Sequence, residues 1–187
     1  DEWSHRGYNH LTALTDHASL ASHINSQAYC GGLYDRGSGQ IQPLKYLMGL
    51  ALAARAAGAH ILEHSRVIKI NRSAKKTLHL HNALQLRADR VLLCGNAYLT
   101  DIGLPDMLRR LAQVTSSVLA TTSLSENMIQ HILPSRATVA DCNTALNYFR
   151  IDADNRMIFG GRASYTNINL GNVEADLRRR MAAVFPV

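Results

Sequence analysis

The 187-residue sequence lacks the features that mark several classes of protein. It has no run of about 20 apolar residues, the length needed to cross a bilayer, so we expect a soluble chain with no membrane partner. The first five residues, DEWSH, are acidic at the start and lead into no apolar segment. This argues against a secretory signal or a transit peptide. Because the chain also does not begin with methionine, it reads as a trimmed product or a fragment of a longer protein.

Cysteine and metal-binding patterns are equally sparse. The three cysteines, Cys30, Cys94 and Cys142, are widely spaced and form no C-x-x-C pair. This argues against a disulfide framework and a thiolate metal site, and it favours a reduced cytoplasmic protein. His79 and His81 share a strand face, but no carboxylate or thiolate lies at ligand spacing, so we predict no metal site. The sequence also lacks G-x-S-x-G, the turn that carries a serine nucleophile.

The positive net charge of the chain is not arranged in a pattern typical of nucleic-acid binding. The formal net charge is +6, yet the only basic clusters are Arg109-Arg110 and Arg178-Arg179-Arg180 on expected helices. No aromatic side chains alternate with them, as they do in many nucleic-acid interfaces. We therefore predict solvated helix faces and no nucleic-acid partner.

A glycine-rich stretch, "YDRGSGQIQPLKYLMGLALAARAAGAHI", looks at first like a nucleotide site. The dinucleotide fingerprint G-x-G-x-x-G needs three glycines between a strand and a helix. Here only Gly37 and Gly39 have the spacing, and Pro43 occupies a position where a free N–H would have to face a phosphate. The sequence therefore predicts a turn that binds no phosphate.

Apolar periodicity and capping residues predict a mixed α/β chain. In the helix after Pro43, an apolar stripe and Gly49 predict close packing on a sheet, and Gly58 is expected to end the helix. The expected helices are one or two within 11–25, one from 43 to 58, one over 124–132 and one from Asn172 or Glu174 to Phe185. The expected strands are 61–62, 67–70, a hairpin of 77–81 with 84–88, a β-rich segment over 112–122, and two strands joined by a turn at 152–155.

The run "RVLLCGNAYL", residues 90–99, differs from the other strands because it is apolar without alternation. Such a run predicts a central parallel strand that is buried on both faces. Ligands of open parallel sheets collect at the carboxyl ends of strands. The turn Gly95-Asn96-Ala97 is therefore a better candidate site than the glycine-rich stretch.

Three segments together resemble a known family: "GGLYDRGSGQIQPLKYLMGLALAARAAGAHILEHSRVIKI", "RVLLCGNAYL" and "NYFRIDADNRMIFGG". They are similar to the flavin amine oxidoreductases of the D-amino-acid oxidase (DAO) superfamily, and within it most to the gamma-glutamylputrescine oxidoreductases. The likeness runs from about Gly31 to Val187 and matches the middle of those enzymes. Their glycine fingerprint and their C-terminal part lie outside the matched region.

The resemblance implies a fold and a division of the chain. The fold would be α/β (mixed α+β), part of an FAD/NAD(P)-binding Rossmann-like domain with a β-rich substrate lobe. Residues 1–100 would form a partial FAD-binding domain with a crossover helix and a β-meander. Residues 101–170 would form the substrate lobe, and residues 171–187 a helix leading back to the C-terminal part.

The resemblance also implies an FAD cofactor and positions for it. Val67 would meet the adenine end of FAD, and Gly95, Asn96 and Ala97 would form the turn against the cofactor. Tyr148 and Arg150 would face the flavin ring and orient an amine-bearing, anionic substrate. The residues alone leave alternatives open, because Val67 also suits a core strand, Tyr148 a sheet face and Arg150 a solvated surface. The sequence nominates no general base.

Two functions follow from these observations. The first is a fragment of an FAD-dependent oxidoreductase that oxidises an amine or amino acid, such as gamma-glutamylputrescine, to an imine by hydride transfer to flavin. The second is a non-catalytic remnant or interaction subunit on the same architecture, which would need the missing parts of the parent chain or a partner chain. Because the fingerprint is missing, we expect the chain alone to be inactive.

Overall fold

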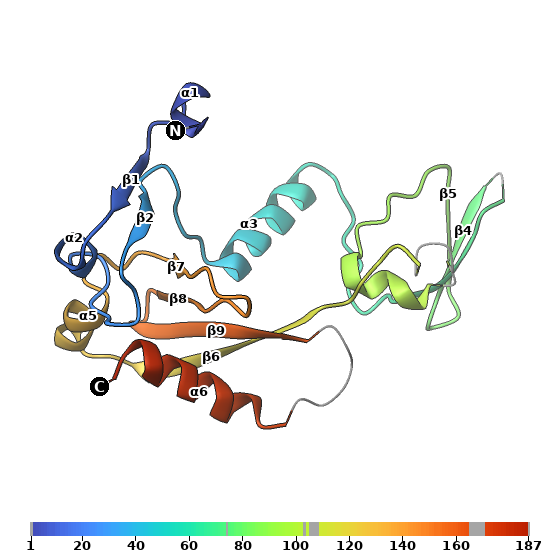
Figure 1. Cartoon of the computed structure of the whole chain (residues 1–187). Helices are drawn as coiled ribbons and strands as arrows, with labels where there is room; N and C mark the ends of the chain where they lie inside the picture. The colour runs from blue at the N-terminus through green and yellow to red at the C-terminus, as the bar shows by residue number, and fades with distance from the viewer. Residues whose placement is uncertain (1, 74, 103, 105–108, 165–170, 187) are drawn as a thin grey trace. The chain divides into compact units, whose positions relative to one another are not determined.

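The computed structural model describes residues 2–73, 75–102, 104, 109–164 and 171–186. The chain forms two compact units (Figure 1): unit 1 combines Asp1–Pro43 with Thr115–Val187, and unit 2 is Leu44–Val114. These bounds differ from the predicted boundaries at residues 100 and 170. The assignment of 1–100, 101–170 and 171–187 to a flavin domain, a substrate lobe and a returning helix stays a prediction.

Unit 1 is built on a four-stranded antiparallel sheet with the order β6-β9-β8-β7. The strands are β6 (Thr115–Ser123), β7 (Val139–Ala140), β8 (Tyr148–Ile151) and β9 (Arg156–Ser164). The predicted hairpin of β8 and β9 is confirmed. Its turn is closed by Asp152 Oδ1, which accepts the backbone N–H groups of Asp154 and Arg156 at 2.9 Å each. Asn155 adopts a positive φ of 60° there, which asparagine tolerates better than most residues.

Two predicted helices of unit 1 are confirmed, and each begins within two residues of its predicted start. Helix α5 (Glu126–Ile132) starts after Ser125, whose hydroxyl accepts the N–H of Met128. Helix α6 (Val173–Val184) starts after Asn172, whose side-chain oxygen accepts the N–H of Ala175. Each cap satisfies one of the backbone donors that a helix N-terminus leaves without an intrahelical partner.

The core of unit 1 lies on one face of this sheet, because the side chains of β8 and β9 alternate between two faces. Phe149 and Phe159 stack with ring centroids 5.5 Å apart, and Phe185 meets Phe149 edge-on at 5.2 Å. Leu177 of α6 and Ile129 of α5 are also buried in this cluster. The opposite face of β8 therefore carries Tyr148 and Arg150, which are half-buried.

The N-terminal segment of unit 1 adds α1 (Glu2–His5), α2 (His17–Ala21) and an antiparallel pair of β1 (Leu11–Leu14) and β2 (Gly32–Asp35). The predicted helix within 11–25 is correct for α2, which Asp16 caps, but wrong for β1. The four residues of β1, with a leucine at each end, have little intrinsic preference for helix or strand. Their conformation is set by β2, which pairs with them from about twenty residues further along the chain.

Unit 2 contains α3 (Pro43–Ala56), whose first residue belongs to unit 1, the sheet β3-β4-β5 and a short 3-10 helix, η1 (Asn96–Asp101). The antiparallel strands are β3 (Val67–Asn71), β4 (Lys76–Leu80) and β5 (Gln85–Ala88), as predicted. Gly58, at φ 91°, follows the end of α3, and Ala83, at φ 65°, sits in the hairpin turn. The predicted strand at Ile61–Leu62 is wrong, because these residues pair with no strand in the described part of the chain.

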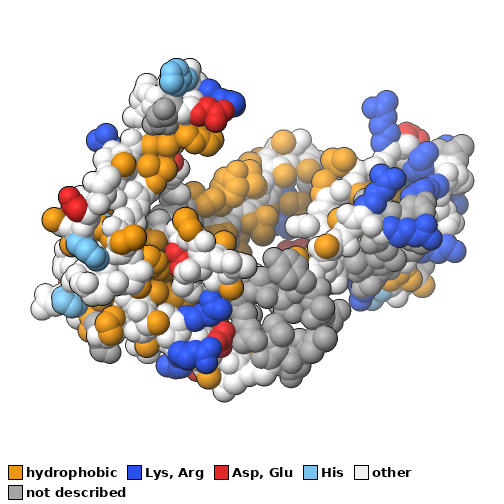
Figure 2. All heavy atoms as spheres, viewed as in Figure 1, with side chains coloured by type: hydrophobic (Ala, Val, Ile, Leu, Met, Phe, Trp, Pro, Cys, Tyr) orange, Lys and Arg blue, Asp and Glu red, His pale blue; other side chains and the backbone are white. Residues whose placement is uncertain are grey.

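The apolar stripe of α3 is not packed on a sheet in the part of the chain that the structure describes. Leu44, Leu47 and Met48 are 59%, 62% and 58% exposed. Nothing lies within 4 Å of the position that a Cβ of Gly49 would occupy. Figure 2 shows apolar side chains gathered along this helix. The helix is confirmed, and its predicted packing is not seen.

The predicted strand over 90–99 is also wrong for the described chain. Residues 91–95 belong to no strand, and Leu92 is 87% exposed. The chain then turns into η1, where Leu99 is buried with Ile102 and Leu104. A strand exists only where a neighbour accepts its backbone hydrogen bonds. An apolar run indicates that its side chains suit a buried position, but it does not show that a neighbouring strand is present.

No helix among the described residues is long and apolar enough to span a bilayer.

Candidate functional site

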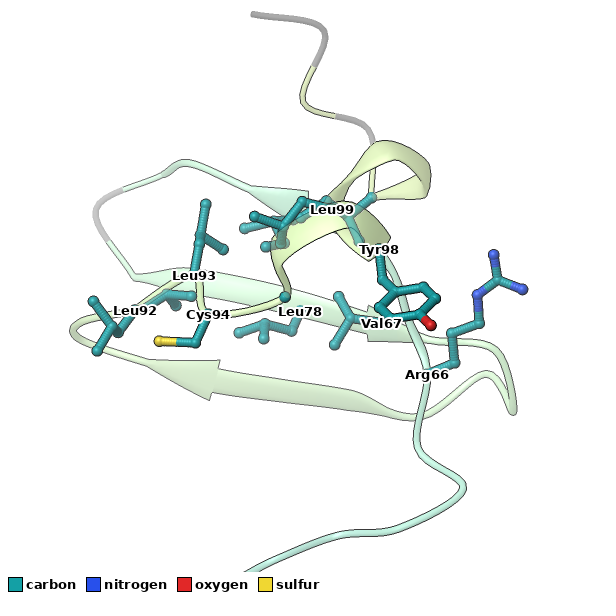
Figure 3. A pocket seen from close by; sticks show the side chains of 12 residues that line it. Arg66, Val67, Leu78, Leu92, Leu93, Cys94, Tyr98 and Leu99 are labelled. Atoms are coloured by element: carbon teal, nitrogen blue, oxygen red, sulfur yellow. The ribbon is translucent and has the colours of Figure 1, made fainter. Parts of the chain in front are cut away.

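Unit 2 holds a cavity of about 610 Å³ between its sheet and η1 (Figure 3). Most of its wall is aliphatic, and its size falls within the range of 300–1,000 Å³ that is usual for small-molecule sites. Gly95 allows the wall to close tightly, because a Cβ there would lie 2.7 Å from Cδ2 of Leu99. The lining residues are Arg66, Val67, Ile70, Leu78, Val91, Leu92, Leu93, Cys94, Gly95, Tyr98, Leu99 and Ile102.

The structure brings two of the predicted cofactor residues to this cavity. Val67 from the start of β3 and Gly95 before η1 line the same wall, although 28 positions separate them. Asn96 and Ala97 follow Gly95 as the first residues of η1. Asn96 has a positive φ of 45°, and the Ala97 carbonyl accepts a hydrogen bond from Gln113 Nε2 at 2.6 Å. The role of these four residues as cofactor contacts stays a prediction.

Arg66 and Tyr98 line the same cavity and are absent from the sequence prediction. Figure 3 shows both at one end of it, with the phenol ring of Tyr98 above Val67. Tyr98 is 87% exposed. Both could have been found from the sequence, because each lies close to a predicted cofactor residue. Arg66 immediately precedes β3, and Tyr98 lies one 3-10 turn after Gly95. This end of the cavity combines an aromatic ring with a cation, a pair that suits a flat, anionic ligand.

Positive charge is concentrated in unit 2. Its sequence contains eleven Lys and Arg residues against four Asp and Glu residues. Figure 2 shows many of these basic side chains over the region of β3, β4 and β5. Such a surface raises the local concentration of an anionic ligand before specific contacts form.

The glycine turn at Gly37–Gly39 is occupied by the side chain of Asp35. The Asp35 carboxylate accepts hydrogen bonds from Tyr8 Oη at 2.7 and 2.9 Å, from the Gly37 N–H at 2.9 Å and from Ser38 Oγ. The Ser38 and Tyr8 hydroxyls hold the pKa of Asp35 below its usual value, and the hydrogen bond to Asp35 raises the pKa of Tyr8. An anionic side chain thus takes up the N–H of Gly37, and the absence of phosphate binding at this turn stays a prediction.

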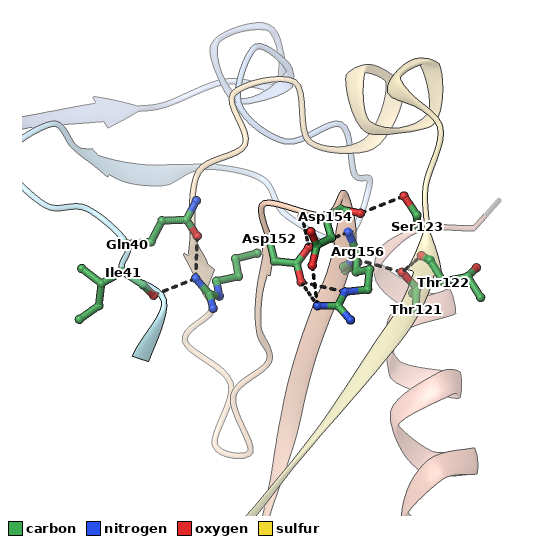
Figure 4. Close-up of polar contacts among 10 residues, drawn as sticks. Gln40, Ile41, Thr121, Thr122, Ser123, Asp152, Asp154 and Arg156 are labelled. Atoms are coloured by element: carbon green, nitrogen blue, oxygen red, sulfur yellow. Dashed lines mark hydrogen bonds and ion pairs between the residues drawn. The ribbon is translucent and has the colours of Figure 1, made fainter. Parts of the chain in front are cut away.

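Tyr148 and Arg150 lie in unit 1, on the face of β8 that points away from the core. The Tyr148 ring covers Gly160, which leaves space for it, and its hydroxyl lies 2.6 Å from Ser116 Oγ on β6. Arg150 Nη1 donates to Gln40 Oε1 at 3.3 Å and to the Ile41 carbonyl at 3.1 Å (Figure 4). Both predicted substrate residues thus occupy one sheet face. Their contact with a substrate stays a prediction.

A second polar cluster on this hairpin is structural. Arg156 donates to Asp152 at 2.9 Å and to Asp154 at 3.1 Å (Figure 4). Burial alone would raise the pKa of Asp152, but hydrogen bonds from the backbone and guanidinium of Arg156 outweigh it, so the pKa lies below the usual value. Both carboxylates are engaged in closing the β8–β9 turn. Among the described residues, no group of three or more His, Cys, Asp and Glu side chains could hold a metal ion.

A model of the family described as "FAD dependent oxidoreductase" (DAO) matches residues 1–187, the whole chain. The chain belongs to this family. The resemblance inferred from the sequence is therefore confirmed, and FAD is the cofactor of the family, as predicted.

The curated relatives are longer than this chain. It is 31% identical over 186 residues to gamma-glutamylputrescine oxidoreductase of Escherichia coli K12, a match that covers 100% of this chain and 43% of that protein. It is 32% identical over 180 residues to a probable oxidoreductase OrdL of Rhizobium meliloti, with 96% and 41% covered. The chain thus spans less than half the length of these relatives.

A solved structure confirms the fold class. Glycine oxidase from Geobacillus kaustophilus matches 98% of this chain with a TM-score of 0.72, 20% sequence identity and 48% of its own chain covered. At this identity the likeness concerns the fold. The mixed α/β architecture of a flavin-binding DAO-type protein is therefore correct for this chain.

Proposed function

We propose that this chain forms the middle part of an FAD-dependent oxidoreductase that oxidises an amine or an amino acid. The observation that carries the proposal is the family match along all 187 residues, together with a cavity in which Val67 and Gly95 meet. The name of the E. coli relative makes gamma-glutamylputrescine one candidate substrate, and the name of the structural neighbour, glycine oxidase, makes glycine another.

The cavity of unit 2 fits one end of the cofactor. Its aliphatic wall suits a flat ring such as adenine, with Val67 and Gly95 against the ring and Asn96 and Ala97 at the adjoining turn. The basic surface of unit 2 favours a cofactor that carries a pyrophosphate. Asp35 fills the glycine turn of unit 1, so the pyrophosphate requires donors other than that turn.

When FAD is bound, it supplies the hydride acceptor for the substrate carbon that bears the nitrogen, which leaves an imine for water to hydrolyse. The contribution of this chain is binding and orientation. Tyr148 offers a hydroxyl that can donate to or accept from the substrate, and Arg150 offers a cation for a substrate carboxylate. Holding the reacting carbon in one orientation lowers the entropic part of the barrier.

A second candidate is a non-catalytic interaction subunit on the same fold. The exposed apolar residues of α3 and the exposed Leu92 favour it, because such surfaces mark contacts with another polypeptide. Either function is proposed for the cytoplasm, which the unpaired cysteines Cys30, Cys94 and Cys142 favour.

A chimera separates these candidates. Residues 1–187 would replace the aligned segment of the E. coli relative, which supplies the remaining 57% of a complete protein. We expect a yellow protein with bound FAD that reduces the flavin on mixing with gamma-glutamylputrescine or another amine. In that chimera, Val67→Asp should lower the flavin content. Tyr148→Phe and Arg150→Ala should slow flavin reduction and leave FAD bound.

The unaltered E. coli protein, which keeps its own middle segment, is the control. A folded chimera that binds no FAD would contradict the enzyme proposal and favour the interaction subunit. Loss of FAD in the Tyr148 or Arg150 variants would show that these residues contact the cofactor and are wrongly assigned to the substrate.

A further inference from the structure

Arg150 differs from several other arginines of unit 1 in the charge of its partners. Arg136 pairs with Glu126 at 2.6 Å, Arg156 pairs with Asp152 at 2.9 Å, and the arginines of α6 pair with Glu174 or Asp176. Among the described residues, Arg150 has no carboxylate within ion-pair distance. Its recorded partners are an amide oxygen and a backbone carbonyl, both uncharged. The guanidinium is therefore held in place, and no carboxylate of the described residues neutralises its charge.

The amide of Gln40 sits at the centre of this arrangement. Its Oε1 accepts from Arg150 Nη1 at 3.3 Å and from Thr138 Oγ1 at 3.2 Å, and its Nε2 donates to the Arg136 carbonyl at 3.5 Å. An arginine can only donate and a carbonyl can only accept, so these partners determine which way the amide faces. Gln40 thus joins the segment before α3 to β8 and to the loop before β7.

We propose that Gln40 is a positioning residue: it holds the Arg150 guanidinium as a receptor for a carboxylate and thereby selects amine substrates that carry an anionic group. This inference rests on the proposed function and deepens it. Both recorded bonds use Nη1, so Nη2 and Nε remain to bind the two oxygens of a carboxylate. Tyr148, two residues away, lies on the same face of β8, with its hydroxyl 2.6 Å from Ser116 Oγ.

The neutrality of Gln40 is essential to the proposal. A carboxylate at position 40 would reach the same Nη1, form an ion pair and compete with any anionic ligand. An apolar side chain would remove the acceptor and let the long arginine side chain sample other rotamers. The residue therefore supplies orientation without neutralising the charge that the ligand needs.

The test uses the 187-residue chain without flavin, so it is independent of the proposed redox activity. Glutarate, a dicarboxylate, is titrated while the Nε–Hε resonance of Arg150 is followed by NMR and assigned by its absence in Arg150→Lys. We expect saturable shifts at millimolar glutarate and none with the neutral analogue glutaramide. Gln40→Glu should weaken glutarate binding at least about tenfold, and Gln40→Met about three- to tenfold.

Gln130→Ala is the matched control, because Gln130 also donates an amide hydrogen bond, to Glu126 at 3.2 Å, but lies on α5. Its affinity for glutarate should stay within about twofold of wild type. Thermal unfolding of each variant separates positioning from folding, since Gln40→Glu should keep the wild-type midpoint while binding is lost. Absence of glutarate binding to the wild type, or equal binding by wild type and Gln40→Glu, overturns the proposal. Flavin binding by the chimera would be unaffected by that result.

Discussion

Replacing Gly160 with alanine should displace the ring of Tyr148 and break its hydrogen bond to Ser116. A Cβ at residue 160 would lie 2.5 Å from Tyr148 Oη and closer still to the ring carbons Cζ and Cε2. Overpacking of this kind costs about 1–3 kcal/mol, and the lost hydrogen bond adds about 0.5–1.5 kcal/mol. Alanine regains about 0.5–1 kcal/mol over glycine in a strand, so we expect a net destabilisation of about 0.5–4 kcal/mol.

A double-mutant cycle isolates this contact, because the three atoms nearest to the added Cβ all belong to Tyr148. In a Tyr148→Ala background, Gly160→Ala should be neutral or stabilising, which gives a coupling energy of about 1.5–4.5 kcal/mol. Urea unfolding followed by circular dichroism measures all four proteins. Gly39→Ala is the control, since no atom lies within 4 Å of its Cβ position. Additivity within about 0.5 kcal/mol would refute the placement of Tyr148 over Gly160.

Four further outcomes follow from the structure. Burial raises the pKa of Tyr29 to about 12, so unit 1 should lose stability between pH 10 and 12, and this loss should shrink in Tyr29→Phe when unfolding is measured across that range. Asp35→Ala removes the shared acceptor of Tyr8, Gly37 and Ser38, so hydrogen exchange should speed up at Gly37; unchanged exchange would contradict the network. Amides of β3, β4 and β5 should exchange faster than those of β8 and β9, because the buried cluster of unit 2 is smaller than that of unit 1; equal protection would argue against this. The chain alone, mixed with FAD and passed through gel filtration, should remain colourless, since Asp35 fills its glycine turn; retained yellow colour would reveal a phosphate site elsewhere.

Elements with local signals could be predicted from the sequence. Ser125 and Asn172 cap α5 and α6, Asp16 caps α2, and the turn at 152–155 joins β8 to β9. In each case one side chain satisfies backbone groups within about four residues, so the information lies in a short window. The strand β1 lies outside this class, because the strand that pairs with it, β2, comes from a segment about twenty residues away.

The candidate sites divide in the same way. The resemblance assigned Val67 and Gly95 to the same cofactor, and both line the cavity of unit 2, although the strand that pointed to Gly95 is absent from the described chain. Strand alternation placed Tyr148 and Arg150 on one face of β8. Gln40 could not be found, because its meaning depends on hydrogen bonds to residues about 100 positions away. No periodicity or spacing in the sequence records such a contact.

The errors of the sequence analysis in unit 2 share one physical cause. The stripe of α3 and the run at 91–95 both predict burial, yet Leu47 and Leu92 are 62% and 87% exposed. Covering such a side chain is worth about 1.5–3 kcal/mol, so a sequence that repeats apolar residues at these positions is suited to surroundings that would cover them. The buried apolar residues in the described part of unit 2 are Leu80, Leu99, Ile102 and Leu104. Its apolar surface and its small core therefore point in the same direction: unit 2 gains stability from whatever covers α3 and residues 91–95.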